Sequence, residues 1–587
     1  MTMLNDLRQT KPGSSLNRRS ASRWIAQSAA PASFLRELPS GLHPLVGQLL
    51  WSRGLTDPDK VDAFLHVTWS QLHDPNQLRD MDRAVERIRQ AIERGERVAV
   101  YGDFDTDGVT GVVLLYQALT GLGLDVLPYI PKRKEEGYGL NTTAVEYLAT
   151  KVGLLITVDC GISSVHEIAR AQALGLDTIV LDHHTPPPVL PTGLAVINPK
   201  RPDCVYPYKM LAGVGVAFKL VQALARAGLK TSVPSRALLD MVVLGTVTDV
   251  APLDGENRVL VKHGLEALNK TERPGLRALI EVAGQRGPLN CRSISFGLGP
   301  RINAAGRLDD AIRAYHLLLC DDAGIAREMA AELNDINVRR QALTVEVLEQ
   351  AQELARRSGK SDDRIIVLNG EGFPAGIVGL VAGRLVEIFG RPVLLLERGE
   401  EICRGSARSI SGYSIVDALA ECTDIFTKYG GHAMAAGFTL LPDRLAELES
   451  RLRDIGLRDL TDEMIAPKLS YDAELPLAEH SFELLDQVAM LEPFGHGNAE
   501  PVWATGNLRV IQARTMSEGR HLKLRVRDDA GYSGEVVAWN YGERVQEFGS
   551  GARVDIAYTL EINEWQGRQS LQMKAKQLRQ THGDINR

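Results

Sequence analysis

The sequence lacks the features of several large protein classes. Its six cysteines are scattered along 587 residues without a Cys-x-x-Cys pair, which argues against a zinc ribbon or a disulfide scaffold and suits a reducing compartment. No run approaches the roughly eighteen apolar residues that a membrane span needs, and the Ser- and Arg-rich start lacks the apolar segment of a signal peptide. A Gly-x-x-x-x-Gly-Lys-Ser/Thr loop is also missing, so nothing indicates nucleotide-driven work. We therefore expect a cytoplasmic protein with no membrane partner.

The overall charge carries little information either. The 67 Lys and Arg residues against 74 Asp and Glu residues give a net charge of −7, so no global basic character indicates nucleic acid. A protein that binds nucleic acid can still carry a local basic face, because the distribution of charge matters more than its sum. Apolar residues (44%) and charged residues (24%) are in ordinary proportion. The length suits about three or four domains.

Short apolar runs alternate with helical patterns between residues 97 and 184. The runs are RVAVYGD (97–103), GLLITVDCG (153–161) and DTIVLDHH (177–184). Strand–helix alternation of this kind predicts a parallel sheet with helices on its faces. We interpret a later apolar run, MVVLGTVTDVAPL (241–253), as a further strand.

Three further regions follow along the chain. Residues 323–357 form a charged pattern with almost no breakers, which predicts an unusually long helix. A second α/β pattern begins at RIIVLNGEG and closes with YGGHAMAAGFTL, and the final part alternates apolar and polar residues as in a small β-barrel. The predicted fold is therefore multidomain α/β. The predicted divisions are a disordered leader (1–40), N-terminal helices with a parallel-sheet catalytic domain (41–320), a connecting helix (321–360), a second α/β domain (361–467) and a barrel (468–587).

Each strand-like run ends in acidic or imidazole side chains. The ligand crevice of an open parallel sheet lies at the carboxyl ends of its strands, so these side chains should converge in space. Several carboxylates cannot gather without a counter-charge, because like charges repel. Oxygen and imidazole donors without thiolate favour Mn²⁺ or Mg²⁺, and so many carboxylates suggest two ions. The candidate donors are Asp103, Asp105, Asp107, Asp159, Asp182, His183, His184 and Asp249.

Each motif alone has a simpler interpretation. A single Asp-x-Asp at a strand end is usually a turn or a helix cap, a His–His pair is usually a surface pair, and Cys160 is most simply a small buried residue. Four acidic strand ends in succession favour a metal site over these interpretations. Two ions about 3.5–4 Å apart would suit phosphoryl displacement, and an imidazole that binds no ion could contact the phosphate or donate a proton.

The motifs YGDFDTDGVTG, TVDCGIS, LDHH and GTVTDVAPL resemble the four motifs of the DHH phosphoesterase superfamily. The stretch YGGHAMAAG resembles the Gly-Gly-His element of the DHH-associated substrate domain. Stretches such as GPRINAAGRLDD and LEPFGHGNAEPVW are similar to the single-strand-specific 5′→3′ DNA exonucleases of that superfamily, over nearly everything after the leader. The resemblance implies a DHH catalytic domain, a DHH-associated domain and a C-terminal OB-fold barrel.

The resemblance also implies roles for particular residues. The metal ligands would be Asp105, Asp107, Asp159, His183 and Asp249, with His184 near the scissile phosphate and Asp182 orienting the pair. The substrate-binding residues would be Arg301, Asn303, Arg307, Ser406, Arg408, Ser409, Gly430, Gly431 and His432. Arg binds phosphate bidentately and Gly allows close backbone approach, although GGHA is also typical of a tight turn.

One position departs from the pattern of the small members of the superfamily. They carry a His four residues before the first acid of their Asp-x-Asp, where this chain has Tyr101, a poor ligand. The extra acid Asp103 is the candidate replacement and would be a sixth metal ligand.

The expected barrel has a local basic character. From Pro501 on, thirteen Lys and Arg against ten Asp and Glu give +3 within an acidic chain. The strand HLKLRVRD places alternate residues on one face, and its candidate DNA-binding residues are Lys523, Arg525 and Arg527. Candidate stacking residues, at least half of them expected in the barrel core, are Trp503, Trp539, Tyr541 and Trp565.

The function expected from the resemblance is that of a metal-dependent exonuclease. It would degrade single-stranded DNA 5′→3′ to mononucleotides in DNA repair and recombination, as a monomer, with a helicase and a single-strand-binding protein as partners. Two alternatives stay open: a phosphodiesterase of short oligonucleotides or cyclic dinucleotides, and a non-catalytic DNA-binding scaffold.

Overall fold

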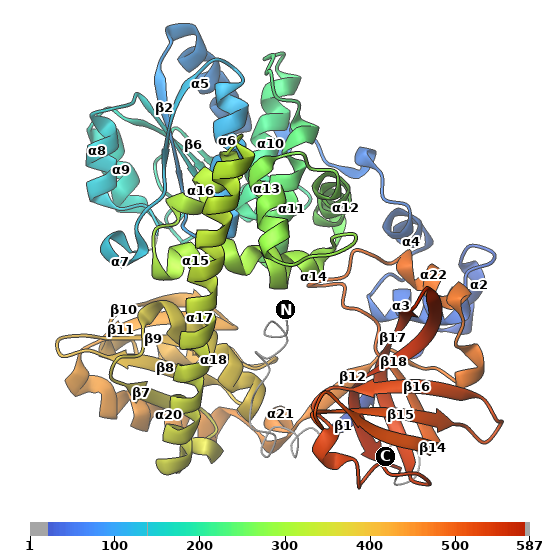
Figure 1. Ribbon diagram of the computed structural model, residues 1–587. Helices are drawn as coiled ribbons and strands as arrows, with labels where there is room; N and C mark the ends of the chain where they lie inside the picture. Colours follow the sequence, from blue (N-terminus) through green and yellow to red (C-terminus); the bar gives the residue numbers. More distant parts are fainter. Residues whose placement is uncertain (1–21, 138, 582–587) are drawn as a thin grey trace. The chain divides into compact units, whose positions relative to one another are not determined.

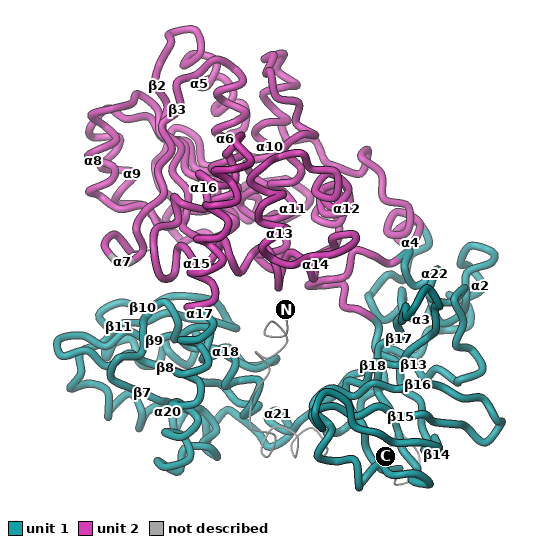
Figure 2. The backbone as a smooth tube through the Cα atoms, in the orientation of Figure 1, with its two compact units in different colours: residues 1–58, 340–490, 501–587 teal, residues 59–339, 491–500 magenta. Residues whose placement is uncertain are grey.

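The computed structural model describes residues 22–137 and 139–581 (Figure 1). The chain divides into two compact units, which Figure 2 distinguishes by colour. Unit 1 lies within residues 1–58, 340–490 and 501–587, and unit 2 comprises residues 59–339 and 491–500. Among the described residues, helices that are both long and apolar enough for a bilayer are absent.

Unit 2 is built on a five-stranded parallel sheet, as the alternating runs predict. Its strand order is β3-β2-β4-β5-β6, and every neighbouring pair is parallel. The strands are β2 (Arg97–Gly102), β3 (Asp125–Tyr129), β4 (Leu154–Val158), β5 (Asp177–Leu181) and β6 (Ala195–Ile197). Alternate residues of β2 enter different cores: Val98 and Val100 join one apolar cluster, whereas Ala99 and Tyr101 join another. The sheet is therefore buried on both faces.

Helices supply the second half of each core. One face packs against α5 (Met81–Arg94), α6 (Thr106–Thr120) and α10 (Gly213–Arg226). The other face packs against α8 (Thr142–Ala149) and α9 (Val165–Ala173). Unit 2 also contains, by sequence order, α4 (Pro58–Leu65), α7 (Arg133–Glu136), α12 (Gly255–Asn269), α13 (Pro274–Val282), α14 (Cys291–Ser293), the π-helix η5 (Ile294–Leu298), α15 (Gly299–Leu308) and α16 (Ile312–Leu319).

The apolar run at 241–253 is not a strand. It forms helix α11 (Leu239–Thr248), in which nearly every residue is buried. A helix that is apolar all round has no amphipathic period, so a short apolar run does not distinguish it from a buried strand. Asp249 is consequently the C-terminal cap of a helix and not a strand end.

The long helix is present as predicted. It is α17 (Ala323–Arg357), with 35 residues. It begins in unit 2 and ends in unit 1, so it connects the two units covalently.

Unit 1 contains a mixed five-stranded sheet of order β10-β11-β9-β8-β7. Its strands are β7 (Ile366–Gly370), β8 (Val393–Arg398), β9 (Cys403–Arg408), β10 (Phe426–His432) and β11 (Ala435–Leu440). The accompanying helices are α18 (Ala375–Phe389), α19 (Ile415–Ala420), α20 (Leu445–Asp459) and α21 (Asp462–Ile465). The Gly-Gly-His stretch thus belongs to strand β10, and the turn of its hairpin follows it.

The C-terminal strands of unit 1 close into a barrel. They are β13 (Ala473–Glu474), β14 (Trp503–Met516), β15 (His521–Arg527), β16 (Ser533–Ala538), β17 (Arg553–Trp565) and β18 (Arg568–Gln580). Pairing of β14 with β17 closes the order β14-β15-β16-β18-β17. Leu522, Leu524 and Val526 are buried inside, as their alternation predicts. Helix α22 (Phe482–Ala489) lies in the chain between β13 and β14.

The expected leader ends earlier than residue 40. Residues 1–21 lie outside the described part, but residues 22–40 contain strand β1 (Arg23–Ala26) and helix α2 (Ala32–Glu37). Strand β1 pairs in parallel with β12 (Lys468–Tyr471), and Trp24 donates a 2.8 Å hydrogen bond to Gln577. This segment is ordered by pairing with a distant strand, which its local composition does not reveal. Helix α3 (Pro44–Ser52) follows it.

Candidate metal centre

The Asp-x-Asp motif joins strand β2 to helix α6. Asp105 caps α6, because its Oδ1 accepts hydrogen bonds from the amides of Asp107 at 2.9 Å and Gly108 at 3.2 Å. A Cβ on Gly108 would lie 2.5 Å from the carbonyl oxygen of Asp103, so the loop folds tightly over the helix start. Three carboxylates are thereby held within five residues.

Asp159 follows strand β4 in a left-handed conformation, with a φ of 61°. Its amide donates to the carbonyl of Leu181, the last residue of β5, at 2.9 Å. A non-glycine residue in this region is uncommon, and such strain is typical of functional sites. The turn directs the side chain toward the neighbouring strand end.

Asp182 holds the two histidines in place through hydrogen bonds. Its Oδ1 accepts from the amides of His183 at 2.7 Å and His184 at 3.1 Å, and it lies 2.7 Å from Nδ1 of His184. Its Oδ2 accepts from the amide of Ile162 at 2.9 Å. Asp182 is buried and its hydrogen-bonding capacity is used, so it fits a supporting role better than that of a ligand.

His183 lies at the centre of the cluster. Its Nε2 is 3.0 Å from Oδ1 of Asp159 and 3.9 Å from Oδ2 of Asp107, and its Nδ1 is 3.8 Å from Oδ2 of Asp249. Side chains from β2, β4, β5 and α11 therefore meet at one edge of the sheet. The predicted convergence is present, although one of its four contributors is a helix.

The donor atoms of the cluster fit divalent cations. Three groups each bring their donor atoms within 4.8 Å of one another: Asp159 with His183 and His184, Asp107 with His183 and Asp249, and Asp103 with Asp105 and Asp159. Within the described residues, Oδ1 of Asp103, Oδ1 of Asp159 and Nε2 of His183 are buried without a hydrogen-bond partner. The last two atoms are only 3.0 Å apart, but their geometry is not that of a hydrogen bond. Buried acceptors left in this way suit a cation.

Electrostatics supports the same conclusion. Burial, followed by the charge of Asp105, raises the pKa of Asp107 to about 7. Burial and neighbouring carboxylates also raise the pKa of Asp103, Asp159 and Asp249 well above the usual range. The cluster therefore resists full ionisation unless positive charge enters it.

The two histidines have opposite proton affinities. Burial, followed by the charge of His184, lowers the pKa of His183 to about 3, so His183 is neutral and able to bind a metal. Burial also opposes charge on His184, but the hydrogen bond to Asp182 outweighs it and raises the pKa of His184 to about 9. Conversely, His184 holds the pKa of Asp182 at about 2 against the effect of burial. His184 is thus suited to act as a cation toward phosphate.

Tyr101 does not take part in the cluster. It is fully buried, donates a hydrogen bond to the carbonyl of Gly139 at 2.8 Å and stacks on Tyr129 at 5.2 Å. Its side chain belongs to the core on one face of the sheet. Asp103 remains the acid that supplements the cluster at this strand end.

The start of helix α10 is a part of the site that the motifs did not indicate. The amides of Gly213 and Val214 donate to Oδ2 and Oδ1 of Asp107 at 2.7 and 2.9 Å. A Cβ on Gly213 would lie 2.6 Å from Cβ of Asp159. The sequence signal for this contact is the glycine pair in LAGVGVAF, and such pairs are also common in helices that only pack closely.

Two cations near the cluster were also missed. Burial lowers the pKa of Lys200, although the carboxylates of Asp249 and Asp182 partly offset this effect. Burial likewise lowers the pKa of Arg133, and the carboxylates of Asp103 and Asp105 partly offset it. The Arg133 guanidinium lies 4.9 Å from the centre of the Phe104 ring. Neither residue stands in a recognisable motif, so a single sequence carries no signal for them.

The basic stretch at 301–307 differs from its expected role. Arg301 is 2% exposed and donates to the carbonyls of Gly297 at 2.7 Å and Val282 at 3.3 Å, so its guanidinium is engaged in helix packing. Asn303 accepts from the amide and hydroxyl of Thr106 at 2.8 and 2.9 Å and thus positions the start of α6. Arg307 is half-buried on the same helix.

The expected residues of the DHH-associated domain lie in unit 1. Arg408 donates to Oγ of Ser406 at 2.6 Å, and Ser409 is buried and donates to the carbonyl of Tyr413 at 2.7 Å. In the sheet, β9 and β10 flank β11, which pairs with both. The exposed residues of β10 include Gly430, Gly431 and His432. Ser409 serves a turn, whereas the other residues share one sheet.

Among the candidate residues of the barrel, half of the aromatic ones are core, as expected. Arg525 and Arg527 are exposed, and Lys523 forms an ion pair with Glu535 at 2.8 Å. Of the four candidate stacking residues, Trp503 and Tyr541 are core, whereas Trp539 and Trp565 are 36% and 71% exposed.

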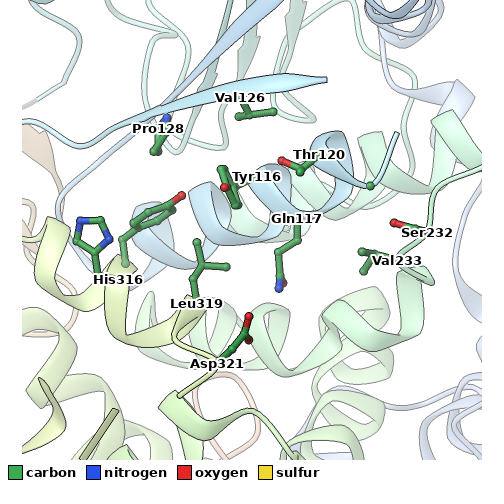
Figure 3. Close-up of a pocket in the computed structure, with 12 residues that line it drawn as sticks. Tyr116, Gln117, Thr120, Val126, Pro128, Ser232, Val233, His316, Leu319 and Asp321 are labelled. Atoms are coloured by element: carbon green, nitrogen blue, oxygen red, sulfur yellow. The ribbon is translucent and has the colours of Figure 1, made fainter. Parts of the chain in front are cut away.

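Unit 2 also has a cleft that is separate from the cluster. Figure 3 shows Tyr116, Gln117, Thr120, Val126, Pro128 and Leu319 around it, and its volume is about 650 Å³. None of the candidate metal ligands lines this cleft. The cluster lies at the edge of the sheet, apart from this cleft.

Three family models match separate parts of the chain. The DHH family N-terminal domain matches residues 97–246, the DHHA1 domain matches 362–455, and the RecJ OB domain matches 471–577. A Bacillus subtilis (strain 168) protein, single-stranded-DNA-specific exonuclease RecJ, is 39% identical over 92% of this chain and 69% of its own length. The Escherichia coli (strain K12) protein of the same name is 37% identical over 92% of this chain and 96% of its own length.

The chain belongs to the RecJ family.

A solved RecJ structure agrees with this assignment. RecJ from Thermus thermophilus, in complex with Mn²⁺, matches with a TM-score of 0.82 and 32% identity, over 96% of this chain and 80% of that one. The RecJ fold is therefore shared, and the predicted fold class is confirmed. The DHH family model stops just before Asp249, the donor that the helix α11 supplies.

Proposed function

We propose that this chain is a metal-dependent exonuclease that degrades single-stranded DNA from its 5′ end to mononucleotides. The observation that carries the proposal is the set of buried, unpaired donor atoms of Asp103, Asp159 and His183 in a RecJ-family chain. The curated relatives are named single-stranded-DNA-specific exonucleases, and RecJ from Thermus thermophilus is solved with Mn²⁺ and with Mg²⁺. DNA repair and recombination are the processes that such an activity serves.

The chain's own residues would hold two ions. We assign one position to Asp107, His183 and Asp249, and the other to Asp103, Asp105 and Asp159, with Asp159 also close to His183. Carboxylate and imidazole donors favour Mn²⁺ or Mg²⁺. Bound there, the ions would activate water and stabilise the charge of a phosphodiester in in-line displacement.

His184 is the residue that we assign to the scissile phosphate. Its raised pKa keeps it protonated, and Asp182 fixes its ring through Nδ1 at 2.7 Å. Its other ring nitrogen, Nε2, is then the donor toward a phosphate oxygen or the leaving oxygen. Asp182 is accordingly a positioning residue.

The remaining predicted contacts belong to DNA binding. We assign to contacts with the DNA backbone Arg307, Ser406, Arg408, Gly430, Gly431 and His432, and on the barrel Lys523, Arg525 and Arg527. Arg301, Asn303 and Ser409 are left out of direct contact because they serve packing and turns. By family alone we infer a monomer in the cytoplasm that works with a helicase and a single-strand-binding protein.

The decisive experiment is digestion of 5′- and 3′-labelled single strands in Mn²⁺, with duplex and EDTA as controls. A 5′ label should appear at once as mononucleotide, a 3′ label only at the end, and duplex or EDTA should give neither. Cutting of dinucleotides alone would favour the phosphodiesterase of short substrates. Binding of long strands with no cutting at any metal concentration would favour the scaffold.

A further inference from the structure

Three large apolar side chains of unit 2 are exposed on segments that carry or adjoin the acidic cluster. Phe296 is 71% exposed, Val250 is 59% exposed and Met210 is 42% exposed. None of them belongs to the ligand set, although Val250 stands in the motif GTVTDVAPL. We call these three residues the apolar rim.

Val250 and Met210 lie directly beside candidate ligands. Val250 follows Asp249 and has a φ of 60°, which is a strained conformation for a β-branched residue. Asn257 is fully buried and donates to the carbonyls of Met210 at 2.6 Å and Pro252 at 3.0 Å, so it holds the two segments together. The backbone of Leu211, next to Met210, interacts with the ring of His183.

Phe296 belongs to a third segment, which packs against α11. It lies in the π-helix η5, and π-helical turns occur frequently at functional sites. Gly299, three residues on, packs against the side chain of Thr248, where a Cβ would not fit. The carbonyl of Gly299 also accepts from Thr106 at 3.5 Å, so η5 and α15 contact both the α11 and the α6 side of the crevice.

An arginine side chain lies beside the Phe296 ring of the apolar rim. The guanidinium of Arg292 lies 5.6 Å from the centre of the Phe296 ring, and both side chains are exposed. A flat aromatic ring beside an exposed guanidinium is typical of single-strand binding, in which a base stacks on the ring and a phosphate meets the cation.

We propose that Phe296 is a stacking platform for a nucleobase close to the scissile phosphate, with Val250 and Met210 completing an apolar contact for the neighbouring sugar and base. This proposal rests on the proposed function, because it takes its ligand from the strand whose phosphate the crevice would hold. Stacking on a ring is tolerant of base identity, which suits an enzyme that removes every nucleotide in turn.

The test combines removal of the ring with removal of the base. Binding of a labelled 12-mer of deoxythymidine and of the same oligomer with abasic residues is measured by fluorescence anisotropy in EDTA, for wild type, F296A, F296L and F296Y. We expect F296A and F296L to bind the normal oligomer roughly fivefold to a hundredfold more weakly, the range of one base stacked on an aromatic ring. F296Y should bind like wild type, and the abasic oligomer should bind all four proteins alike.

A matched control comes from another exposed ring of unit 2. Tyr147 is 50% exposed on α8, a helix that packs on the face of the sheet turned away from α6 and α10, so Y147A should bind both oligomers like wild type. Equal losses of F296A for normal and abasic oligomers, or no loss at all, would overturn the proposal. Because binding is read in EDTA, a wild type that binds normally but cuts nothing would defeat the proposed function and leave the stacking result intact.

Discussion

The amide of Gly213 donates a hydrogen bond to Oδ2 of Asp107 across 2.7 Å, and the position of a Cβ on Gly213 is only 2.6 Å from Cβ of Asp159. Helix α10 thus begins in contact with two candidate ligands that come from different strands. The missing side chain of Gly213 allows the approach, and its backbone amide fixes the carboxylate. This residue sets a distance on which the metal centre depends.

The substitution G213A should therefore disable the centre without unfolding the protein. The added methyl group must displace either Asp159 or the start of α10. A misplacement of about 1 Å is enough to reduce the rate on the order of a hundredfold. We expect a loss of that size in kcat for single-stranded DNA and weaker Mn²⁺ binding by isothermal titration calorimetry.

Gly215 provides the control for this experiment. It lies on the same helix, two residues on, and a Cβ there would meet Leu211 at an ordinary 3.4 Å. G215A should bind Mn²⁺ and cut DNA like wild type. If G213A did so too, the contact between α10 and the crevice would have no bearing on function.

The two histidines should separate in their effects. H183A removes a central donor and leaves three carboxylates facing one another, so we expect Mn²⁺ affinity to fall. H184A leaves those donors in place, so metal affinity should hold while kcat falls roughly 10²- to 10⁴-fold, as for loss of a general acid or phosphate contact. Calorimetry and steady-state kinetics on the same preparations measure both.

Asp182 permits a further check on this division. D182N keeps the shape of the side chain but removes the charge that raises the pKa of His184. The pH profile of kcat should then lose activity at a lower pH than in wild type, as His184 deprotonates earlier. An unchanged alkaline limit would mean that His184 does not act as the cation.

Metal binding should release protons. Burial and like charge raise the pKa of Asp107 to about 7 and those of Asp103, Asp159 and Asp249 well above normal, so protons compete with the metal. Affinity for Mn²⁺ should therefore strengthen as the pH rises from about 6 to 8. Calorimetry in buffers of different ionisation enthalpy counts the protons, and a pH-independent affinity would contradict the assignment.

A half-buried histidine that precedes α22 should make stability depend on pH. Burial lowers the pKa of His480 to about 4, and its Nε2 lies 2.7 Å from the hydroxyl of Tyr558. Between about pH 6.5 and 4 the unfolded chain binds a proton that the folded chain does not, so stability falls as the pH falls through this window. The variant H480Q should show a smaller loss of melting temperature between pH 7 and 5 than wild type.

Much of the centre could be predicted from the sequence because strand ends are local features. Asp103, Asp105, Asp107, Asp159, His183 and His184 each follow an apolar run, and parallel strands bring their carboxyl ends to one edge. Asp249 was predicted on the wrong element, because a buried helix and a buried strand are equally apolar over so short a run.

The failures concern long-range packing. Arg301 stands in a basic stretch, yet its guanidinium satisfies two helix carbonyls in the core, and only the fold reveals those partners. Strand β1 is ordered by pairing with Lys468–Tyr471, more than four hundred residues away. Its local composition therefore does not distinguish it from a disordered tail. Gly213 and Lys200 reach the crevice from segments without a motif of their own.

The crowded carboxylates of the crevice tie the folding of unit 2 to the divalent-cation content of its surroundings. Each ion that binds only the folded chain adds RT ln(1 + [M]/Kd) to its stability, about 2.7 kcal/mol at a hundredfold excess over Kd. Protein prepared in a chelator and protein prepared with Mn²⁺ should therefore have different free energies of unfolding. They should differ in melting temperature and protease resistance before any DNA is added, and metal supply would set how long the folded chain survives in a cell.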